Sequence, residues 1–292
     1  MCRSKGEKIF SVFNILFMLI LGACMLFPFM HVLAKSLSSE TAVMRGEVLI
    51  VPKELHFGTY QFVMTNSQFY VSFFVSLRVT IIGTLLAMGL TIFTAYPLSK
   101  RWLKGRSAVL MFYLFIMLFQ GGIVPNYLLY RTLNLTNTIF CLILPMCLNV
   151  FNMLIMKNYF ETMPESIEES ARIDGAEFIA ILFRIVIPIS MPVIATIALF
   201  YSVDYWNNFF YALLYNSSPK YKPLQLFLYE MVTEVRISVE KIADFNTDRA
   251  MNLTAESILS ATIIVATMPI LLVYPFLQRY FVKGIIIGSV KG

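Results

Sequence analysis

Long apolar stretches alternate with short polar stretches along almost the whole chain. We expect six membrane spans, at residues 9–31, 71–98, 108–130, 136–156, 189–215 and 254–277. An α-helix rises about 1.5 Å per residue, so a stretch of roughly 20 apolar residues crosses a hydrocarbon core about 30 Å thick. The pattern therefore predicts an all-α polytopic membrane protein, with a single transmembrane domain over residues 1–292.

The first apolar stretch could instead be the core of a cleaved signal peptide. Basic residues precede it, and residues 21–24, Leu-Gly-Ala-Cys, imitate a lipoprotein cleavage site. The apolar run continues through Met30, however, whereas a cleavable core usually has only about 7 to 15 residues. We therefore expect residues 9–31 to remain as the first span.

Two longer polar regions, residues 35–70 and 216–253, lie on one side of the predicted membrane. The first is rich in Ser, Gly and Pro, which favour turns, and the second is polar and amphipathic. On the opposite side the connections are shorter and carry more Lys and Arg, as in the loop at residues 99–106. Because positive residues favour the cytoplasm, both termini and residues 158–188 are predicted to be cytoplasmic, and the two longer regions extracellular.

Composition agrees with this assignment. Hydrophobic residues make up 58% of the chain and charged residues only 14%, compared with about a quarter charged in soluble domains. The net charge of +6 follows from the membrane orientation and requires no nucleic-acid partner. Cys24, Cys141 and Cys147 lie inside apolar stretches, so we expect buried thiols and no disulfide framework, and the two histidines lack partners at metal-ligand spacing.

The segment at residues 158–188 is the most strongly charged interruption between spans. Residues 165–172 are good helix formers, and residues 176–187 form a second, amphipathic piece. Asp174 and Gly175 separate the two. Because glycine reaches backbone angles that other residues avoid, we predict two short helices bent at Gly175, forming a cytosolic docking surface.

Two ionisable residues fall inside spans at comparable depths, Arg78 in the second and Asp204 in the fifth. A lone charge near mid-bilayer costs about 2.5–3.5 kcal/mol on insertion scales, so each should find a partner or face a wet cavity. Two interpretations stay open: a structural ion pair between them, or a polar contact that lines a solute pathway.

Asp204 also begins a run of polar and aromatic side chains. Amides and a carboxylate beside aromatic faces suit sugars, which offer hydroxyl groups and apolar ring faces. The same side chains could form an interfacial aromatic belt or pack between helices. The candidate residues for a solute pathway are Asp204, Tyr205, Trp206, Asn207, Asn208, Asn126 and Asn152.

The sequence lacks the motifs of an energy-converting or hydrolytic enzyme. No Gly-Lys dipeptide occurs, so a phosphate-binding P-loop is absent, and no Gly-rich dinucleotide motif or zinc-protease motif is present. We therefore expect this chain neither to hydrolyse ATP nor to bind a cofactor or metal of its own.

Residues 169–176 read Glu-Ser-Ala-Arg-Ile-Asp-Gly-Ala, with Pro188 closing the apolar stretch that follows. This pattern resembles the EAA motif of permease subunits in binding-protein-dependent ABC importers, with Ser170 in place of the usual alanine. Residues 119–129, 206–207, 223–225 and 278–292 are similar to carbohydrate-uptake permeases related to the second subunit of the maltose importer, in the branch with LplC and YtcP. The resemblance spans nearly the whole chain.

The resemblance implies a type I ABC importer permease fold with six transmembrane helices and a cytosolic coupling helix, in the bacterial cytoplasmic membrane. The implied partners are a homologous second permease subunit, two cytosolic ATPase subunits that hold ATP and Mg, an extracellular solute-binding protein, a carbohydrate substrate and the lipid bilayer. The implied ATPase-coupling positions are Glu169, Ser170, Ala171, Asp174, Gly175 and Ala176.

Two other classes of function stay open on the residues alone. An ATP-independent secondary transporter or channel needs ion-binding groups inside its spans, and only Arg78 and Asp204 are available. Uptake without any ATPase subunit would establish that class. A membrane enzyme of cell-envelope assembly would need a catalytic constellation that the sequence does not show. The sequence does not distinguish a monosaccharide from an oligosaccharide or a polysaccharide fragment.

Overall fold

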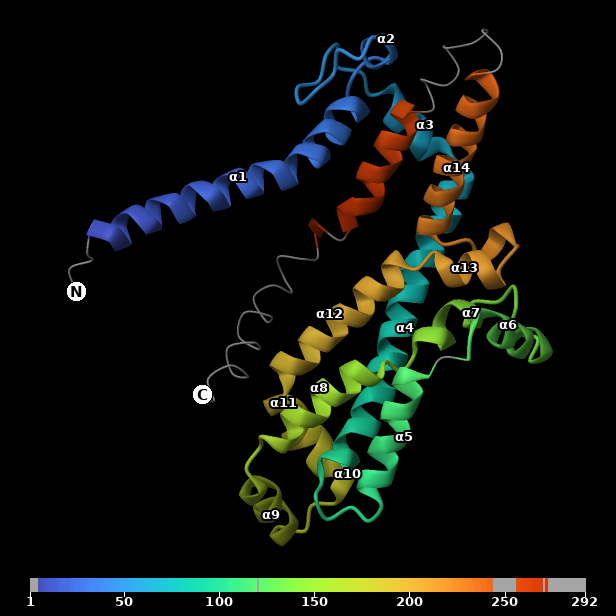
Figure 1. Cartoon of the computed structure of the whole chain (residues 1–292). Helices are drawn as coiled ribbons and strands as arrows, with labels where there is room; N and C mark the ends of the chain where they lie inside the picture. The colour runs from blue at the N-terminus through green and yellow to red at the C-terminus, as the bar shows by residue number, and fades with distance from the viewer. Residues whose placement is uncertain (1–4, 120, 244–255, 270, 273–292) are drawn as a thin grey trace. The chain divides into compact units, whose positions relative to one another are not determined.

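The computed structural model describes residues 5–119, 121–243, 256–269 and 271–272, and in this part of the chain it is all-α (Figure 1). The contacts divide the chain into two compact units. The first unit comprises Met1–Phe69 and Leu228–Met268, and the second comprises Tyr70–Phe227 and Pro269–Gly292. The functional segment predicted from the sequence lies in the second unit.

In the first unit, the long helix α1 (Lys5–Ser36) contains the first predicted span. None of the side chains in its apolar window is buried (0%), so its surface is available to lipid or to another subunit. At its C-terminal end, Lys35 Nζ donates to Glu256 Oε1 at 2.6 Å, which joins α1 to the helix Glu256–Pro269.

The predicted loop at residues 35–70 contains helices, which its turn-rich composition did not indicate. Helix α2 (Glu40–Met44) begins at Ser39, whose side chain accepts a hydrogen bond from the Ala42 amide. The Ser39 hydroxyl also donates to Glu54 at 2.6 Å, and this hydrogen bond holds the pKa of the Glu54 carboxyl below its usual value. Helix α3 (Gly58–Thr65) follows. The region at residues 216–253 likewise contains a long helix, α14 (Leu224–Ala243).

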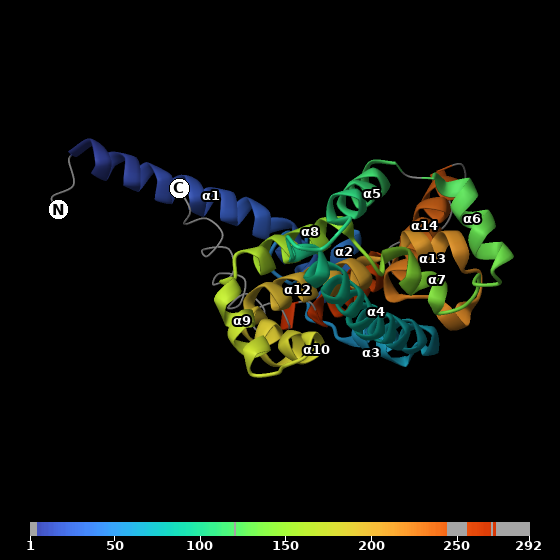
Figure 2. The same ribbon diagram turned by 90° about the horizontal axis from the view of Figure 1, so that it is seen from below.

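The second unit contains most of the helices. They are α4 (Ser67–Ser99), α5 (Arg106–Leu118), α6 (Ile123–Thr132), α7 (Phe140–Ile143), α8 (Val150–Glu161), α9 (Glu165–Ile173), α10 (Phe178–Ile181), α11 (Ile187–Ile189), α12 (Met191–Asn207) and α13 (Phe210–Tyr215). Short 3₁₀ turns at Leu144–Met146 and Pro219–Tyr221 and a π-helical turn at Leu182–Val186 connect them. Seen from below in Figure 2, α8 packs between α12 and α5.

Helices α1 and α4 are both long and apolar enough to cross a membrane. Three further apolar segments are helix pairs bent at a short break: α5 with α6 by 108°, Phe140–Met146 with α8 by 50°, and Phe178–Ile189 with α12 by 84°. The last predicted span is described only in part, by the shorter helix Glu256–Pro269. The apolar segments follow the predicted spans in order, but the third, fourth and fifth spans are not continuous.

Specific side chains and backbone angles explain these breaks. Gly122, the residue before α6, has φ +84°, an angle that favours glycine, and it interrupts the span predicted at residues 108–130. Asn149 interrupts the span predicted at residues 136–156, because its side chain caps α8 by accepting from the Phe151 and Asn152 amides. A hydropathy pattern reflects only how apolar the residues are, so it does not reveal the backbone angle of Gly122 or the hydrogen bonds of Asn149.

The fifth predicted span, residues 189–215, begins and ends differently from the prediction. Ser190 separates α11 from α12, and α12 ends at Asn207. The side-chain oxygen of Asn208 then accepts from the Tyr211 amide at 3.2 Å, which starts the separate helix α13. Within the predicted bounds, the longest helix is therefore α12, which is flanked by shorter helices.

Buried side chains of α12 contact α4 within the core of the second unit. Val193, Ile197, Tyr201 and Tyr205 recur every fourth residue along α12 and are all buried. A Cβ atom added to Gly83 of α4 would lie 2.7 Å from the Tyr205 ring, so the two helices meet where α4 has no side chain. The Tyr201 and Thr91 hydroxyl groups, 2.8 Å apart, join the helices farther along.

The two ends of the second unit have different composition. The basic α4–α5 loop, α9 and α10 lie together at one end (Figure 1). At the other end, α6, α7 and α13 come together, and the Tyr130 and Tyr215 rings stack with their centroids 4.6 Å apart. The first end contains the segment that the sequence predicts to be a cytosolic docking surface.

Candidate coupling site

Helix α9 has charges that suit both of its ends. Glu165 and Glu168 lie in its first turn and Arg172 in its last, so each complements the partial charge of the nearer helix terminus. Pro164 precedes the first turn and fixes where the helix begins. The helix predicted at residues 165–172 is confirmed and extends one residue further, to Ile173.

The predicted bend at Gly175 is also confirmed, and its hydrogen bonds are those of a Schellman motif. The Gly175 amide donates to the Arg172 carbonyl at 3.0 Å, and the Ala176 amide donates to the Ala171 carbonyl at 2.9 Å. Gly175 has φ +83°, in the left-handed region. These bonds satisfy carbonyl groups at the end of α9 and set the direction in which the chain leaves it.

Beyond the bend, the chain forms α10, the π-helical turn and α11 in succession. The predicted second amphipathic helix at residues 176–187 is therefore present, but it is interrupted by the wider π turn. A cavity of about 410 Å³ opens beside the bend. Its charged lining residues are Asp174, Glu177 and Arg184.

The implied coupling positions divide between an exposed and a covered set. Glu169, Ser170, Asp174 and Gly175 are exposed, whereas Ala171 is buried and Ala176 is half-buried. The serine at position 170 fits the helix, because its hydroxyl donates to the Ser166 carbonyl at 2.9 Å. The exposed set could contact a partner, and the small covered residues allow close packing beneath it.

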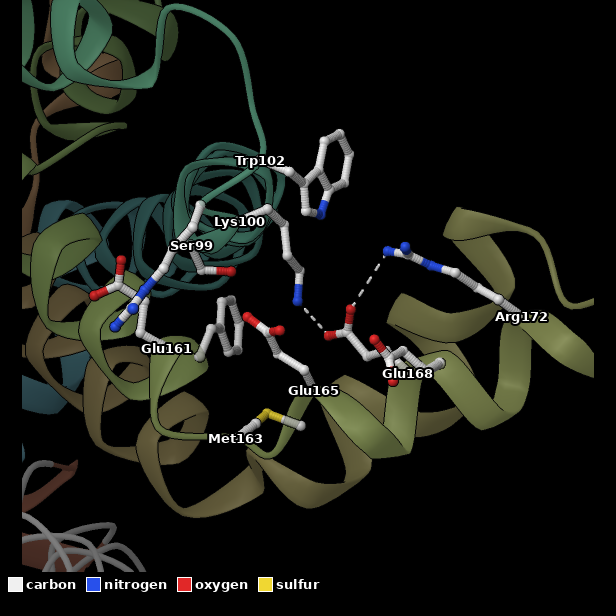
Figure 3. A pocket seen from close by; sticks show the side chains of 11 residues that line it. Ser99, Lys100, Trp102, Glu161, Met163, Glu165, Glu168 and Arg172 are labelled. Carbon is white, nitrogen blue, oxygen red and sulfur yellow. Dashed lines mark hydrogen bonds and ion pairs between the residues drawn. The ribbon is translucent and has the colours of Figure 1, made fainter.

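The structure adds two residues that the sequence analysis did not select, Glu168 and Lys100. The Glu168 side chain is directed away from the exposed set, and its Oε1 accepts a hydrogen bond from Lys100 Nζ of the α4–α5 loop (Figure 3). Arg172 Nη2 lies 3.8 Å from the other oxygen of Glu168. Glu168, the neighbour of the motif residue Glu169, thus forms its ion pairs with cations of this chain.

Aromatic rings surround this charged group. Lys100 Nζ lies 4.7 Å from the centroid of the Tyr96 ring, and Arg172 Cζ lies 5.7 Å from the Trp102 ring. The Phe178 ring of α10 contacts both aromatic residues, with centroids 4.6 Å from Tyr96 and 6.4 Å from Trp102. The end of α4 and its loop therefore contact both helices that flank the bend.

A second ion-pair group lies at the end of α8. Glu161 Oε1 accepts from Arg106, the first residue of α5, and from Lys157 at 2.8 Å. The sequence contained a signal for both groups, since a loop with four basic residues is matched by acidic residues in the segment from 161 to 169. Which cation binds which carboxylate depended on the tertiary structure.

The candidate solute-pathway residues differ in their exposure. Tyr205, Trp206 and Asn152 are buried between helices. The Tyr205 hydroxyl donates to the Ile143 carbonyl at 2.9 Å, and the Trp206 ring meets Phe73 edge-on at 6.0 Å. These three side chains pack helices together within this chain.

The other candidates lie nearer the surface. Asp204, Asn207 and Asn126 are exposed, and the half-buried Asn208 accepts from a backbone amide at the start of α13. The exposed residues are accessible to a solute or a partner subunit. Their contact with a solute stays a prediction.

A structural ion pair between Arg78 and Asp204, one of the two interpretations left open, is absent from the ion pairs of the described residues, and both side chains are exposed. Each residue lies one position away from a buried neighbour, Val79 on α4 and Tyr205 on α12. Successive residues on a helix are rotated by about 100°, so both charges lie off the packed stripes. The comparable depth of the two charges along their helices stays a prediction, whereas the packing of the helices decides on which face each charge lies.

Known proteins resemble this chain over its whole length. The family described as "Binding-protein-dependent transport system inner membrane component" matches residues 85–287. Protein LplC of Bacillus subtilis (strain 168) is 43% identical over 100% of this chain and 98% of its own length. The polygalacturonan/rhamnogalacturonan transport system permease protein YtcP of the same organism is 40% identical over 98% of this chain and 99% of its own length.

A solved structure extends the likeness to three dimensions. It is the crystal structure of a bacterial ABC transporter involved in the import of the acidic polysaccharide alginate, one chain of which matches with a TM-score of 0.86 and 30% identity. The match covers 96% of this chain and 99% of that one. With its bent apolar helices and its α9–α10 bend, this chain belongs to the family of binding-protein-dependent transport system inner membrane components and has the type I ABC importer permease fold.

Proposed function

We propose that this chain forms one half of the translocation pathway of a carbohydrate importer, and that α9 and α10 couple it to ATP hydrolysis by cytosolic partner subunits. Its membership of the permease family supports the transport role. The polysaccharides after which YtcP and the alginate importer are named support an oligosaccharide or a polysaccharide fragment as the solute. A homologous permease subunit would provide the other half of the pathway, and a solute-binding protein would deliver the sugar.

The observation that carries the coupling role is the exposed surface at the bend. Glu169, Ser170 and Asp174 are exposed there beside Ile173, whose exposure reaches 85%. A large apolar side chain flanked by carboxylates suits a protein partner, because the apolar group gains from burial while the charges set the orientation. We assign this surface to the cytosolic ATPase subunits, which would hold ATP and Mg.

The connections of α9 explain how movement there could reach the membrane. Only residues 162–164 separate α9 from α8, and the Gly175 bend joins α9 to α10. The hydrogen bonds of the bend limit independent rotation of the two short helices. Closure of the ATPase subunits would therefore displace the helices of the fourth and fifth spans and expose the pathway alternately to each side.

Charge reversal at the exposed surface tests this function. In the assembled transporter, Glu169→Lys combined with Asp174→Lys should abolish solute uptake while the chain still folds and inserts, since both side chains are exposed. ATP hydrolysis should continue without driving transport. The measurements are uptake and ATP hydrolysis in proteoliposomes, with Glu47→Lys, an exposed carboxylate outside this surface, as the control.

Unchanged uptake by an assembled double variant would contradict the coupling role. Uptake by this chain in membranes that lack the ATPase subunits would instead favour an ATP-independent transporter or channel. The solute class has its own test: the purified partner binding protein should bind an oligosaccharide or polysaccharide fragment in a calorimetric titration. Failure to bind any carbohydrate would remove that assignment and leave the coupling role unaffected.

A further inference from the structure

We propose that the α4–α5 loop is a clasp that holds α9, so that the second and third spans move together with the coupling helix. The clasp consists of Lys100, Trp102 and Arg106 on one side and Glu161, Glu168 and Arg172 on the other. Lys100 and Glu168 are its positioning residues. The inference rests on the proposed function, because it requires that partner ATPase subunits displace α9.

The central ion pair of the clasp is nearly buried. Exposure is 13% for the Lys100 side chain and 8% for that of Glu168, compared with 52% and 42% for the surface pair Lys53–Glu47. Separating a buried pair leaves two charges without partners in a poorly solvated place, whereas an exposed pair separates at little cost. Helix α9 and the loop should therefore stay in contact when either one is displaced.

The clasp also contacts the helices before and after α9, which are α8 and α10. Arg106 binds Glu161 at the end of α8, and the Trp102 ring is close to both Arg172 of α9 and Phe178 of α10. The close view of the site shows the Lys100 side chain extending toward Glu168 of α9, with Trp102 beside it (Figure 3). Contact with three successive helices restrains α9 along its length.

Hydrogen bonds join the loop to α4 and α5. The Arg106 side chain donates from Nε to the Leu98 carbonyl at 2.7 Å, which ties the start of α5 to the end of α4. The Lys100 amide donates to the Pro97 carbonyl at 3.1 Å, and the Leu103 amide donates to the Lys100 carbonyl at 3.2 Å. Because the loop cannot flex freely, force on Lys100 would pass into both helices.

These contacts define two routes for movement of α9. The covalent route runs through α8 and through α10 to α12, which are the fourth and fifth spans. The second route runs through the Lys100–Glu168 pair to α4 and α5. A purely static brace would stabilise the chain to the same extent but would not take part in transport, so the test must follow both movement and coupling.

Distance measurements in the complete transporter test joint movement. Spin labels at Arg101→Cys and Ser166→Cys, both exposed positions, report the separation of the loop and α9 in a background lacking the four native cysteines. With native Lys100, we expect one distance in the nucleotide-free and ATP-bound states. With Lys100→Met, we expect the distance to differ between the states. A distance that changes with nucleotide in the native pair would overturn the proposal.

Transport measurements test coupling. Lys100→Met and Glu168→Gln should each lower uptake per ATP hydrolysed, by about five- to tenfold, a typical size for coupling between sites. The two substitutions combined should be no worse than either alone, because they remove the same interaction. Lys100→Arg should retain coupling. Arg101→Gln removes a neighbouring charge that has no described ion pair and should leave uptake unchanged.

The outcomes separate this proposal from the function on which it rests. If the Glu169 and Asp174 reversals abolish uptake but Lys100→Met and Glu168→Gln leave uptake per ATP unchanged, the clasp is only a brace and the proposal fails. If the charge reversals also leave uptake unchanged, the proposed coupling function is wrong, and the clasp proposal, which rests on it, falls with it. Should Lys100→Met not assemble, Glu168→Gln provides the same comparison of uptake per ATP. A nucleotide-dependent distance with native Lys100 would still overturn the proposal, since that experiment changes neither partner of the ion pair.

Discussion

Neighbouring residues in the coupling segment have opposite roles. Glu169 is exposed at the surface, whereas Glu168 is buried and binds Lys100. The motif resemblance indicated Glu169, but a linear pattern does not show which side of α9 faces the α4–α5 loop. The bend at Gly175 could be predicted from the sequence, because a glycine after a helix-forming run favours a left-handed turn. Such a turn depends only on local backbone geometry.

The requirement for glycine at position 175 concerns its backbone angle and not space. An added Cβ would meet nothing within 4 Å, yet φ is +83°. Gly175→Ala should therefore strain the bend by about 1–2 kcal/mol and lower uptake per ATP, with Gly175→Asn less affected. Gly46 has φ +67° and is equally uncrowded, so Gly46→Ala should have a similar effect on thermal unfolding but leave coupling intact.

Uptake and ATP hydrolysis in proteoliposomes, together with the melting temperature of the purified transporter, measure these effects. Equal coupling in Gly175→Ala and the unmodified chain would show that the angle of the bend does not control transmission.

At the scale of helices, the breaks and the close contacts have local causes. The backbone angle of Gly122 separates α5 from α6, and the side-chain cap of Asn149 begins α8. Both interrupt stretches that the apolar pattern predicts to be continuous. The α4–α12 contact depends on Gly83, which lets the Tyr205 ring approach. A glycine inside an apolar span was visible in the sequence, but its partner across the interface was not.

The two glycines in the middle of α4 provide a matched comparison. Gly83→Ala would place a Cβ atom 2.7 Å from the Tyr205 ring, so the helices must shift, at a cost of about 1–3 kcal/mol in stability. Gly89→Ala adds a methyl group with no atom of this chain within 4 Å and should be near neutral or slightly stabilising. Thermal unfolding of the purified complex measures both. A larger loss for Gly89→Ala than for Gly83→Ala would contradict the α4–α12 packing described above.

At the scale of the whole molecule, the family and fold follow from the full-length match, and the orientation in the membrane stays a prediction. The basic α4–α5 loop lies beside α9 in the same unit, so both should face the same side of the membrane. The charge distribution predicts that this side faces the cytoplasm and that residues 35–70 lie outside. The exposed surface on α9 can meet cytosolic ATPase subunits only if this end of the second unit faces the cytoplasm.

Labelling of single cysteines in intact cells tests this orientation. Leu55 is 66% exposed in the predicted extracellular region, so Leu55→Cys should react with a membrane-impermeant maleimide added outside. Ser166→Cys on α9 should react only after the cells are permeabilised. The experiment uses a chain without its four native cysteines, which contribute no signal of their own. The reverse pattern of reactivity would overturn the predicted topology.

The sequence by itself determined the class of protein, the order of the apolar segments, the two short helices and the bend at Gly175. These depend on hydropathy, local backbone preference and a contiguous motif, all of which act over short distances along the chain. Only the tertiary structure decided that Glu168 binds Lys100, that Tyr205 packs on Gly83, and that Arg78 and Asp204 do not pair. Those outcomes depend on how helices rotate and cross, which places residues distant in the sequence on shared or opposite faces.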